Sequence, residues 1–221
     1  MTISDEDKVL LDGHEVERAL LADWRIMFTT IEARFRTGDF ATGVRLVEAI
    51  GKAADELDHH PDVDLRYGHV DVRLSSHDVG GITQRDIRLA RTVSELAGRV
   101  GATADTASLQ VVEFAIDTWD HHEISGFWGA VLGFETDRDH EIVDADGRWS
   151  TVWFQHSERH DTPQQRWHVD VRVPPEQAEA RIKAAIDAGG TLVSDERAPA
   201  FWVLADAQGN QACITTWLGR D

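Results

Sequence analysis

The sequence predicts an α+β protein with two domains: an N-terminal antiparallel sheet with helices on one face, and a C-terminal pair of βαβββ units. Two amphipathic helical patterns between short alternating strands predict the first domain. The second domain is predicted because the same order of strands and a helix occurs twice in the sequence. Residues 100–108 are small and polar without hydrophobic periodicity, so we expect them to link domains 1–99 and 109–221.

The elements of the first domain follow from its hydrophobic spacing. Residues 5–22 are expected to form a short helical segment, and residues 24–36 a strand with alternating apolar side chains. Helices are expected at 39–57 and 83–99, with an alternating strand at 69–75 between them. The core face of the first of these helices is expected to carry Phe40, Val44, Val47, Gly51 and Ala54.

Each unit of the second domain contains a strand, a helix and further strands in the same order. The first unit is expected to have a strand at 111–116, a helix at 125–131 and strands around 144–154. The second is expected to have a strand at 168–173, a helix at 176–188 and strands around 201–217. Placed side by side, the units should form a pair of curved sheets around a cleft.

The composition of the chain excludes several classes of binding partner and of metal site. The chain has 40 acidic and 22 basic residues, a formal charge of −18, which repels nucleic acid and anionic membranes. Cys213 is the only cysteine, so an internal disulfide and a cysteine-cluster metal site are excluded. The stretch MTISDEDKVL lacks the apolar region of a signal peptide, and no apolar run approaches the roughly 20 residues that span a bilayer. We therefore expect a cytoplasmic protein without nucleic-acid or membrane partners.

The segment DELDHHPDVDLRYGHVDVRLSSHDVGGITQRD, residues 55–86, contains the candidate residues His59, His60, His77 and Asp86. In a purely structural interpretation, His59 and His60 follow a helix, where its dipole favours a cation by roughly 0.3–1 kcal/mol, and Asp86 caps the next helix. In a functional interpretation, the ends of these elements meet at one rim of the sheet. Imidazoles with pKa values near ~6.5 would then supply both an acid and a base.

This segment resembles the pterin-4a-carbinolamine dehydratase (4a-hydroxytetrahydrobiopterin dehydratase) family. The family pattern joins a charged residue, His-His-Pro, an aromatic residue, a further histidine and an aspartate at fixed spacings. Its elements are matched in order by Asp55, His59, His60, Pro61, Tyr67, His77 and Asp86. With "LADW" and "DIRLARTV", the resemblance covers about residues 3–99.

The resemblance implies dehydration of a 4a-hydroxytetrahydropterin to the quinonoid dihydropterin, in tetrahydropterin recycling, without metal or organic cofactor. Hydroxide is a poor leaving group, so one group must protonate it while another removes the N5 proton. On this basis His59 and His77 are expected to transfer protons, His60 to orient the pterin, and Asp86 to hold a histidine tautomer. The family also implies a homodimer or tetramer.

Further side chains around the motif are candidates for binding the pterin. These are Asp55, Asp58, Ser75, Ser76, Asp78 and Tyr67. Tyr67 is equally well interpreted as a core residue, and Trp24 is expected in the core.

The second half resembles the glyoxalase-like, or vicinal-oxygen-chelate, superfamily over about residues 109–218. The stretches "DTWDHHEISGFWGAVLGFE" and "DAQGNQACI" carry this resemblance. Many members bind a divalent metal, and the matching positions here are Gln110, His168 and either Gln211 or Cys213. Because only His168 is a convincing ligand, we expect no metal there. The seven tryptophans of this half suit a core or an apolar pocket for a second small ligand.

Three functional readings therefore remain open at the level of sequence. The first is a lyase acting on a pterin through the histidines of the N-terminal half. The second is a non-catalytic protein that binds a pterin or another small ligand or mediates dimerisation. In the third, the main activity resides in the glyoxalase-like domain.

Overall fold

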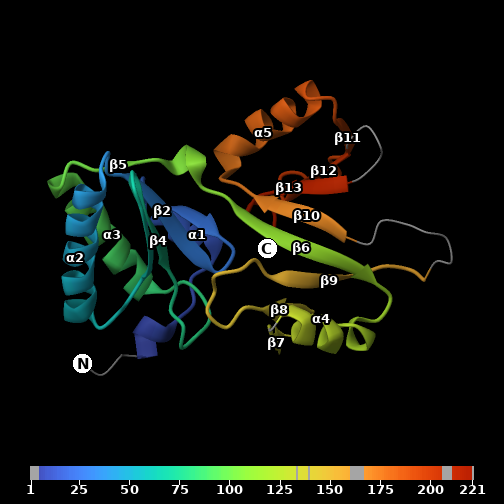
Figure 1. Cartoon of the computed structure of the whole chain (residues 1–221), viewed down its shortest axis with the longest axis horizontal. Helices are drawn as coiled ribbons and strands as arrows, with labels where there is room; N and C mark the ends of the chain where they lie inside the picture. Colours follow the sequence, from blue (N-terminus) through green and yellow to red (C-terminus); the bar gives the residue numbers. More distant parts are fainter. Residues whose placement is uncertain (1–4, 133, 139, 160–166, 206–210, 221) are drawn as a thin grey trace. The chain divides into compact units, whose positions relative to one another are not determined.

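The computed structural model describes residues 5–132, 134–138, 140–159, 167–205 and 211–220 (Figure 1). The chain divides into two compact units, Met1–Leu109 and Gln110–Asp221. Among the described residues, no helix has the length and apolar character needed to cross a membrane.

The N-terminal unit is an antiparallel sheet covered by two long helices, as predicted (Figure 1). The 3₁₀ helix η1 (Asp5–Lys8) and the helix α1 (Gly13–Arg18) precede it. The sheet order is β1-β2-β4-β3, and β5 also pairs with β2. The strands are β1 (Arg25–Met27), β2 (Thr30–Arg36), β3 (Asp62–Arg66), β4 (His69–Leu74) and β5 (Thr103–Ala104). The long helices are α2 (Phe40–Leu57) and α3 (Gln84–Arg99).

Alternation along the two central strands produces the core of this unit. Ile31 and Phe35 of β2, and Val70 and Leu74 of β4, are almost fully buried on one face. The intervening residues form charged cross-strand pairs, including Arg34 with Asp71 at 2.6 Å. The expected strand periodicity is therefore confirmed, because one face meets the helices while the other carries ion pairs.

Three features of this unit were not predicted. Residues 24–36 form a hairpin of β1 and β2 rather than one strand, with Phe28 in the left-handed region at φ 58°. The strand β3 was not expected. The expected linker, residues 100–108, also takes part in the sheet, because β5 pairs with β2 and Asp105 forms an ion pair with Arg36 at 2.6 Å.

The buried face of α2 also differs from the predicted one. Phe40 and Val44 are 48% and 44% exposed, whereas Leu46 and Ile50 are buried. Gly43 explains the choice, since a Cβ atom there would lie only 2.5 Å from Leu65 Cδ1 of β3. The helix packs where its backbone can approach the sheet most closely, and its second apolar stripe is left on the surface.

The C-terminal unit contains the predicted repeat of β-α-β-β-β. The first copy comprises β6 (Val111–Thr118), α4 (Ser125–Leu132), β7 (Glu135–Arg138), β8 (Glu141–Val143) and β9 (Val152–His156). The second comprises β10 (Trp167–Arg172), α5 (Pro175–Asp187), β11 (Thr191–Ser194), β12 (Phe201–Ala205) and β13 (Gln211–Thr215). Two 3₁₀ turns, η2 (Thr106–Ser108) and η3 (His121–Glu123), flank β6. Gly133, Asp206, Gly209 and Asn210 lie outside the described residues.

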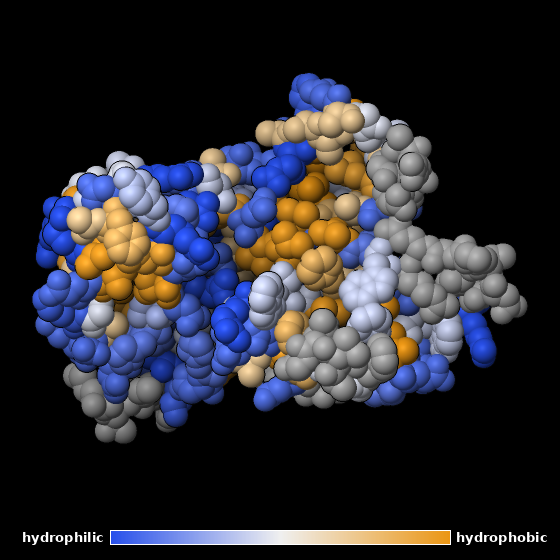
Figure 2. Space-filling model, viewed as in Figure 1, coloured by the Kyte–Doolittle hydropathy of each residue, from blue (hydrophilic) through white to orange (hydrophobic). Residues whose placement is uncertain are grey.

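The two copies join edge to edge in one eight-stranded sheet, rather than in a pair of sheets. Its order is β11-β12-β13-β10-β6-β9-β8-β7, with β6 and β10 antiparallel at the centre. Trp128 of α4 packs near Ile116, and Ala178 of α5 packs with Ile214, so both helices lie on the apolar face. Figure 2 shows apolar side chains over β6 and β10, where Phe114 is 41% exposed.

Candidate functional site

The histidine pair lies where α2 ends. Asp58 adopts the left-handed conformation at φ 50° and terminates the helix, and the amide of His59 then bonds to the carbonyl of Ala54 at 3.1 Å. This reversal turns the His59 ring inward, where the residue is 7% exposed. His60 stays on the surface and its Nε2 lies 3.0 Å from Oδ1 of the exposed Asp55. Adjacent histidines therefore occupy different environments, as expected.

Asp86 in the first turn of α3 connects the buried groups. Its Oδ1 lies 2.7 Å from Nε2 of His59. Its Oδ2 accepts hydrogen bonds from the Thr83 amide at 2.7 Å and from Ser76 Oγ at 2.8 Å. One carboxylate thus completes the capping box of α3, as the structural interpretation predicted, and also contacts the imidazole of His59.

The charge of this carboxylate follows from a balance of opposing effects. Burial by itself raises the pKa of Asp86, but the hydrogen bonds from His59, the Thr83 amide and Ser76 outweigh it and leave the pKa below its usual value. An ionised Asp86 accepts the Nε2 proton of His59. The neutral form of His59 then carries its proton on Nε2 and its lone pair on Nδ1.

The loop after β4 is fastened to the start of α3. The Ser76 amide bonds to the Gly81 carbonyl at 2.8 Å, and Arg85 Nη2 donates to Asp78 Oδ1 at 2.5 Å. The hydrogen bond from Arg85 lowers the pKa of Asp78. This loop carries His77 and Ser75, with His77 exposed and Ser75 half-buried. Arg85, itself 8% exposed, was missed from sequence, where it is only an interior letter of the capping box.

Tyr67 does not belong with the histidines of its own unit. It lies 76% exposed in the turn between β3 and β4. His60 and His77 flank the opposite end of this hairpin, where Asp62 pairs with Arg73. Five strand residues at ~3.4 Å each separate the two ends by about 17 Å. The expectation that Tyr67 lies in the core is therefore wrong, and its contact with the substrate stays a prediction.

The C-terminal unit carries a second group of ionisable side chains on the sheet face opposite its helices. The strand register aligns Glu113, Asp170 and Cys213 across β6, β10 and β13. Burial, and next Asp170, raise the pKa of Glu113 to about 7 and that of Cys213 to about 12. Burial also lowers the pKa of Arg172 to about 10. Such shifts are typical of functional sites.

The metal positions implied by the glyoxalase resemblance are partly realised. Donor atoms of His168, Asp170 and Cys213 lie within 4.8 Å of one another, a nitrogen, oxygen and sulfur set that suits zinc. Gln110 instead accepts a hydrogen bond from Arg181 at 3.0 Å, and Gln211 is exposed. A metal here would be held by the first three residues and would have to displace the thiol proton.

Comparisons with known proteins divide the chain into the same two parts as the two compact units of the structure. A family model described as pterin 4 alpha carbinolamine dehydratase matches residues 9–96. A protein from Metallosphaera sedula named "Putative pterin-4-alpha-carbinolamine dehydratase" is 38% identical over 88 residues, which cover 39% of this chain and 92% of that protein. The chain belongs to the pterin-4-alpha-carbinolamine dehydratase family. A relative of the same name from Nocardia farcinica is 39% identical over 90 residues, covering 40% of this chain and 95% of that protein.

Solved structures and a second family model complete the comparison. A transcriptional coactivator/pterin dehydratase from Brucella melitensis is 33% identical, with a TM-score of 0.39, and covers 41% of this chain and 100% of that one. A model described as glyoxalase-like domain matches residues 113–215. A glyoxalase/bleomycin resistance protein/dioxygenase superfamily member from Vibrio splendidus is 12% identical, with a TM-score of 0.35, covering 49% of this chain and 99% of that one.

Proposed function

We propose that this protein dehydrates a 4a-hydroxytetrahydropterin to the quinonoid dihydropterin in tetrahydropterin recycling. The observation that carries the proposal is the buried contact of 2.7 Å between His59 Nε2 and Asp86 Oδ1. A carboxylate that fixes one ring nitrogen leaves the other with a defined role in proton transfer. Membership of the dehydratase family supplies the substrate class.

The proposed reaction breaks the C4a–O bond and forms a C4a–N5 double bond. The oxygen leaves as water after protonation, and the electron pair of the N5–H bond forms the new double bond as a base takes the proton. His59 and His77 serve as this acid and base, His60 orients the ring, and Asp86 holds the tautomer of His59. No electrons are exchanged with a further reactant, so the step balances without a redox cofactor, and we propose that it uses no metal either.

The remaining polar residues of the motif complete the proposed substrate site. Asp55 and Ser75 are available to the polar edge of the pterin. Asp58 acts mainly through its helix-ending conformation, Ser76 through its hydrogen bond to Asp86, and Asp78 through its ion pair with Arg85.

The test is the dehydration rate measured with chemically generated carbinolamine by stopped-flow absorbance. His59→Ala and His77→Ala should each slow the reaction at least tenfold, within the ~10²–10⁴ that acid–base groups supply. His14→Ala, an exposed histidine of α1, is the matched control and should keep the full rate. Chelator-treated protein should also keep it. Full rates in both site variants, with unchanged circular dichroism, would show that the histidines are not catalytic.

The protein is further proposed to form a homodimer or tetramer. Figure 2 shows apolar side chains on the N-terminal unit in the region where Figure 1 draws α2, and Phe40 and Val44 are largely exposed there. Covering such side chains in a second copy stabilises association by roughly 25 cal/mol per Å² of apolar surface. Phe40→Ser should lower the sedimentation coefficient, whereas Tyr67→Ser, on another exposed aromatic residue, should not.

An alternative places the main activity in the C-terminal unit. The raised pKa of Glu113 and the buried Asp170 beside it favour a polar small ligand on that sheet face. Titration with a dihydropterin distinguishes the two units. Binding that is lost in His59→Ala and kept in Glu113→Gln supports the N-terminal site, and the reverse pattern supports this alternative.

A further inference from the structure

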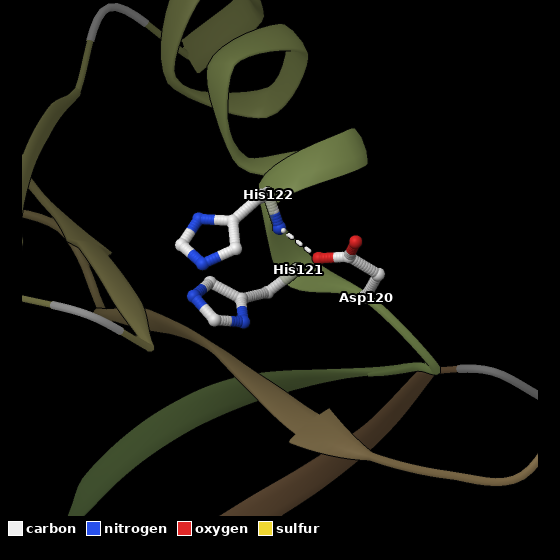
Figure 3. Close-up of side chains that lie close together, drawn as sticks. All are labelled: Asp120, His121 and His122. Carbon is white, nitrogen blue, oxygen red and sulfur yellow. Dashed lines mark hydrogen bonds between the residues drawn. The ribbon is translucent and has the colours of Figure 1, made fainter.

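A second imidazole cluster lies in the C-terminal unit, away from the ionisable sheet face described above. In η3, the rings of His121 and His122 have centroids 3.9 Å apart and an interplanar angle of 40° (Figure 3). The ring of His140 lies 4.5 Å from that of His121, edge-on. Donor atoms of Asp120, His121 and His122 lie within 4.8 Å of one another. Three imidazoles and a carboxylate therefore come from two separate segments.

Backbone and side-chain contacts hold this cluster in place. Asp120 caps η3 by accepting the His122 amide at 2.9 Å, and Thr118 Oγ1 donates to the Asp120 carbonyl at 3.1 Å. The ring of His121 is stacked on Phe154 of β9 at 6.4 Å. The amide of Phe154 also bonds to the carbonyl of His140 at 2.7 Å. His122 is exposed, whereas His121 is half-buried.

The chemistry of these donors selects a class of ligand. Two imidazoles at van der Waals separation repel each other when both are protonated, whereas neutral imidazoles are preferred ligands of zinc and its neighbours. Metal–nitrogen bonds of about 2.0–2.1 Å place two ligand atoms no more than about 4.2 Å apart, and the donor atoms here already lie within 4.8 Å of one another. The net charge of −18 also raises the local concentration of cations.

We propose that Asp120, His121 and His122 bind a divalent transition-metal ion of the zinc class, with His140 as the adjacent fourth donor. The ion would join the turn between β6 and α4 to the segment before β8. This site is distinct from the His168 group, because its donors come from a turn rather than from strands β10 and β13. It is also independent of the proposed pterin chemistry.

Cobalt(II) titration of the chelator-treated full chain tests the proposal, since cobalt reports its ligands by visible absorption. We expect d–d bands without a thiolate-to-metal charge-transfer band. His122→Ala, at an exposed position that should not disturb folding, should weaken binding at least tenfold, and His121→Ala should do the same. Competition with zinc should remove the cobalt bands.

Two matched variants complete the design. His156→Ala, at an exposed histidine of β9, and Cys213→Ser, in the His168 group, should both keep this cobalt affinity. Unchanged affinity in His122→Ala, or the absence of cobalt binding to the wild-type chain, would overturn the proposal. So would a charge-transfer band whose loss in Cys213→Ser removes all binding, because the metal would then occupy the strand site.

Discussion

The two units differ in how completely their buried polar groups are hydrogen-bonded. In the N-terminal unit, Asp86 is fully buried and receives hydrogen bonds from His59, Ser76 and the Thr83 amide. In the C-terminal unit, Trp153 Nε1 and Thr215 Oγ1 are buried without a hydrogen-bond partner among the described residues, and Asp170 Oδ1 has only a long contact of 3.6 Å with His168 Nε2.

The N-terminal polar cluster therefore has a complete set of hydrogen bonds, whereas the C-terminal one does not. A satisfied polar cluster fixes the orientation of its members and adds to stability, whereas each unsatisfied buried group costs about 1–3 kcal/mol. The unsatisfied face is also where the pKa values of Glu113, Arg172 and Cys213 are most perturbed. Its groups would gain most from a ligand, whereas Asp86 already has its hydrogen-bond partners within the fold.

The largest expected effect contrasts the two buried carboxylates. Asp86→Ala removes the cap of α3 and leaves His59 Nε2 and Ser76 Oγ without their hydrogen-bond partner. We therefore expect a loss of about 3–4 kcal/mol in unfolding free energy. Asp170→Asn should change stability by less than about 1 kcal/mol, because it removes a charge that lacks a full set of partners. Hydrogen exchange resolved by peptide measures each unit separately. Equal losses in the two variants would remove the proposed contrast.

The second effect is a pH dependence that separates the units. The pKa of Glu113 is raised by burial, and next by Asp170, to about 7 from 4.5. Between these values the folded chain keeps a proton that the unfolded chain has lost, so stability is present below pH 4.5 and falls as the pH rises to about 7. The pH dependence that Asp86 contributes has the opposite sign. Because the pKa of Asp86 is lowered in the folded chain, this residue stabilises the fold at pH values above the usual pKa of an aspartate, and the contribution is lost in acid.

Glu113→Gln isolates this effect in the C-terminal unit. The variant should abolish the decline in unfolding free energy between pH 4.5 and about 7. At pH 8 its unfolding free energy should exceed that of the wild type by up to about 3 kcal/mol, at 1.36 kcal/mol per pKa unit. Urea unfolding across pH 4 to 8, followed by fluorescence, measures it, since seven of the eight tryptophans lie in this unit. An unchanged pH profile would mean that Glu113 is ionised in the folded state.

A smaller effect compares two indole groups. Trp24 is 4% exposed, and its Nε1 donates to Ser94 Oγ at 3.0 Å, whereas Trp153 Nε1 has no such acceptor among the described residues. Trp24→Phe should therefore destabilise its unit by about 1–2 kcal/mol more than Trp153→Phe destabilises the other. Thermal unfolding of both variants tests this, and a larger loss for Trp153 would show that its N–H is satisfied in solution.

The smallest effect concerns the two ends of the β3–β4 hairpin. Tyr67→Ala should alter the dehydration rate less than twofold, because its side chain lies far from the histidines of its own unit. His60→Ala, at the histidine end, should reduce the rate severalfold. A tenfold loss in Tyr67→Ala would indicate that this residue completes the site of a second copy.

Sequence alone determined the features that depend on local periodicity and spacing. These include the alternating strands around Ile31 and Val70, the capping box of Thr83 and Asp86, the repeated β-α-β-β-β order and the histidine motif. Each of them is encoded within a few residues, where backbone preference and side-chain alternation act directly.

Only the tertiary structure decided which segments meet. It buried the stripe of Leu46 in place of that of Phe40, because Gly43 admits the closest approach to the sheet. It paired β5 with β2, and it gave Asp86 both a helix cap and the imidazole of His59. These outcomes depend on strand register and on packing between distant segments, which local periodicity does not encode.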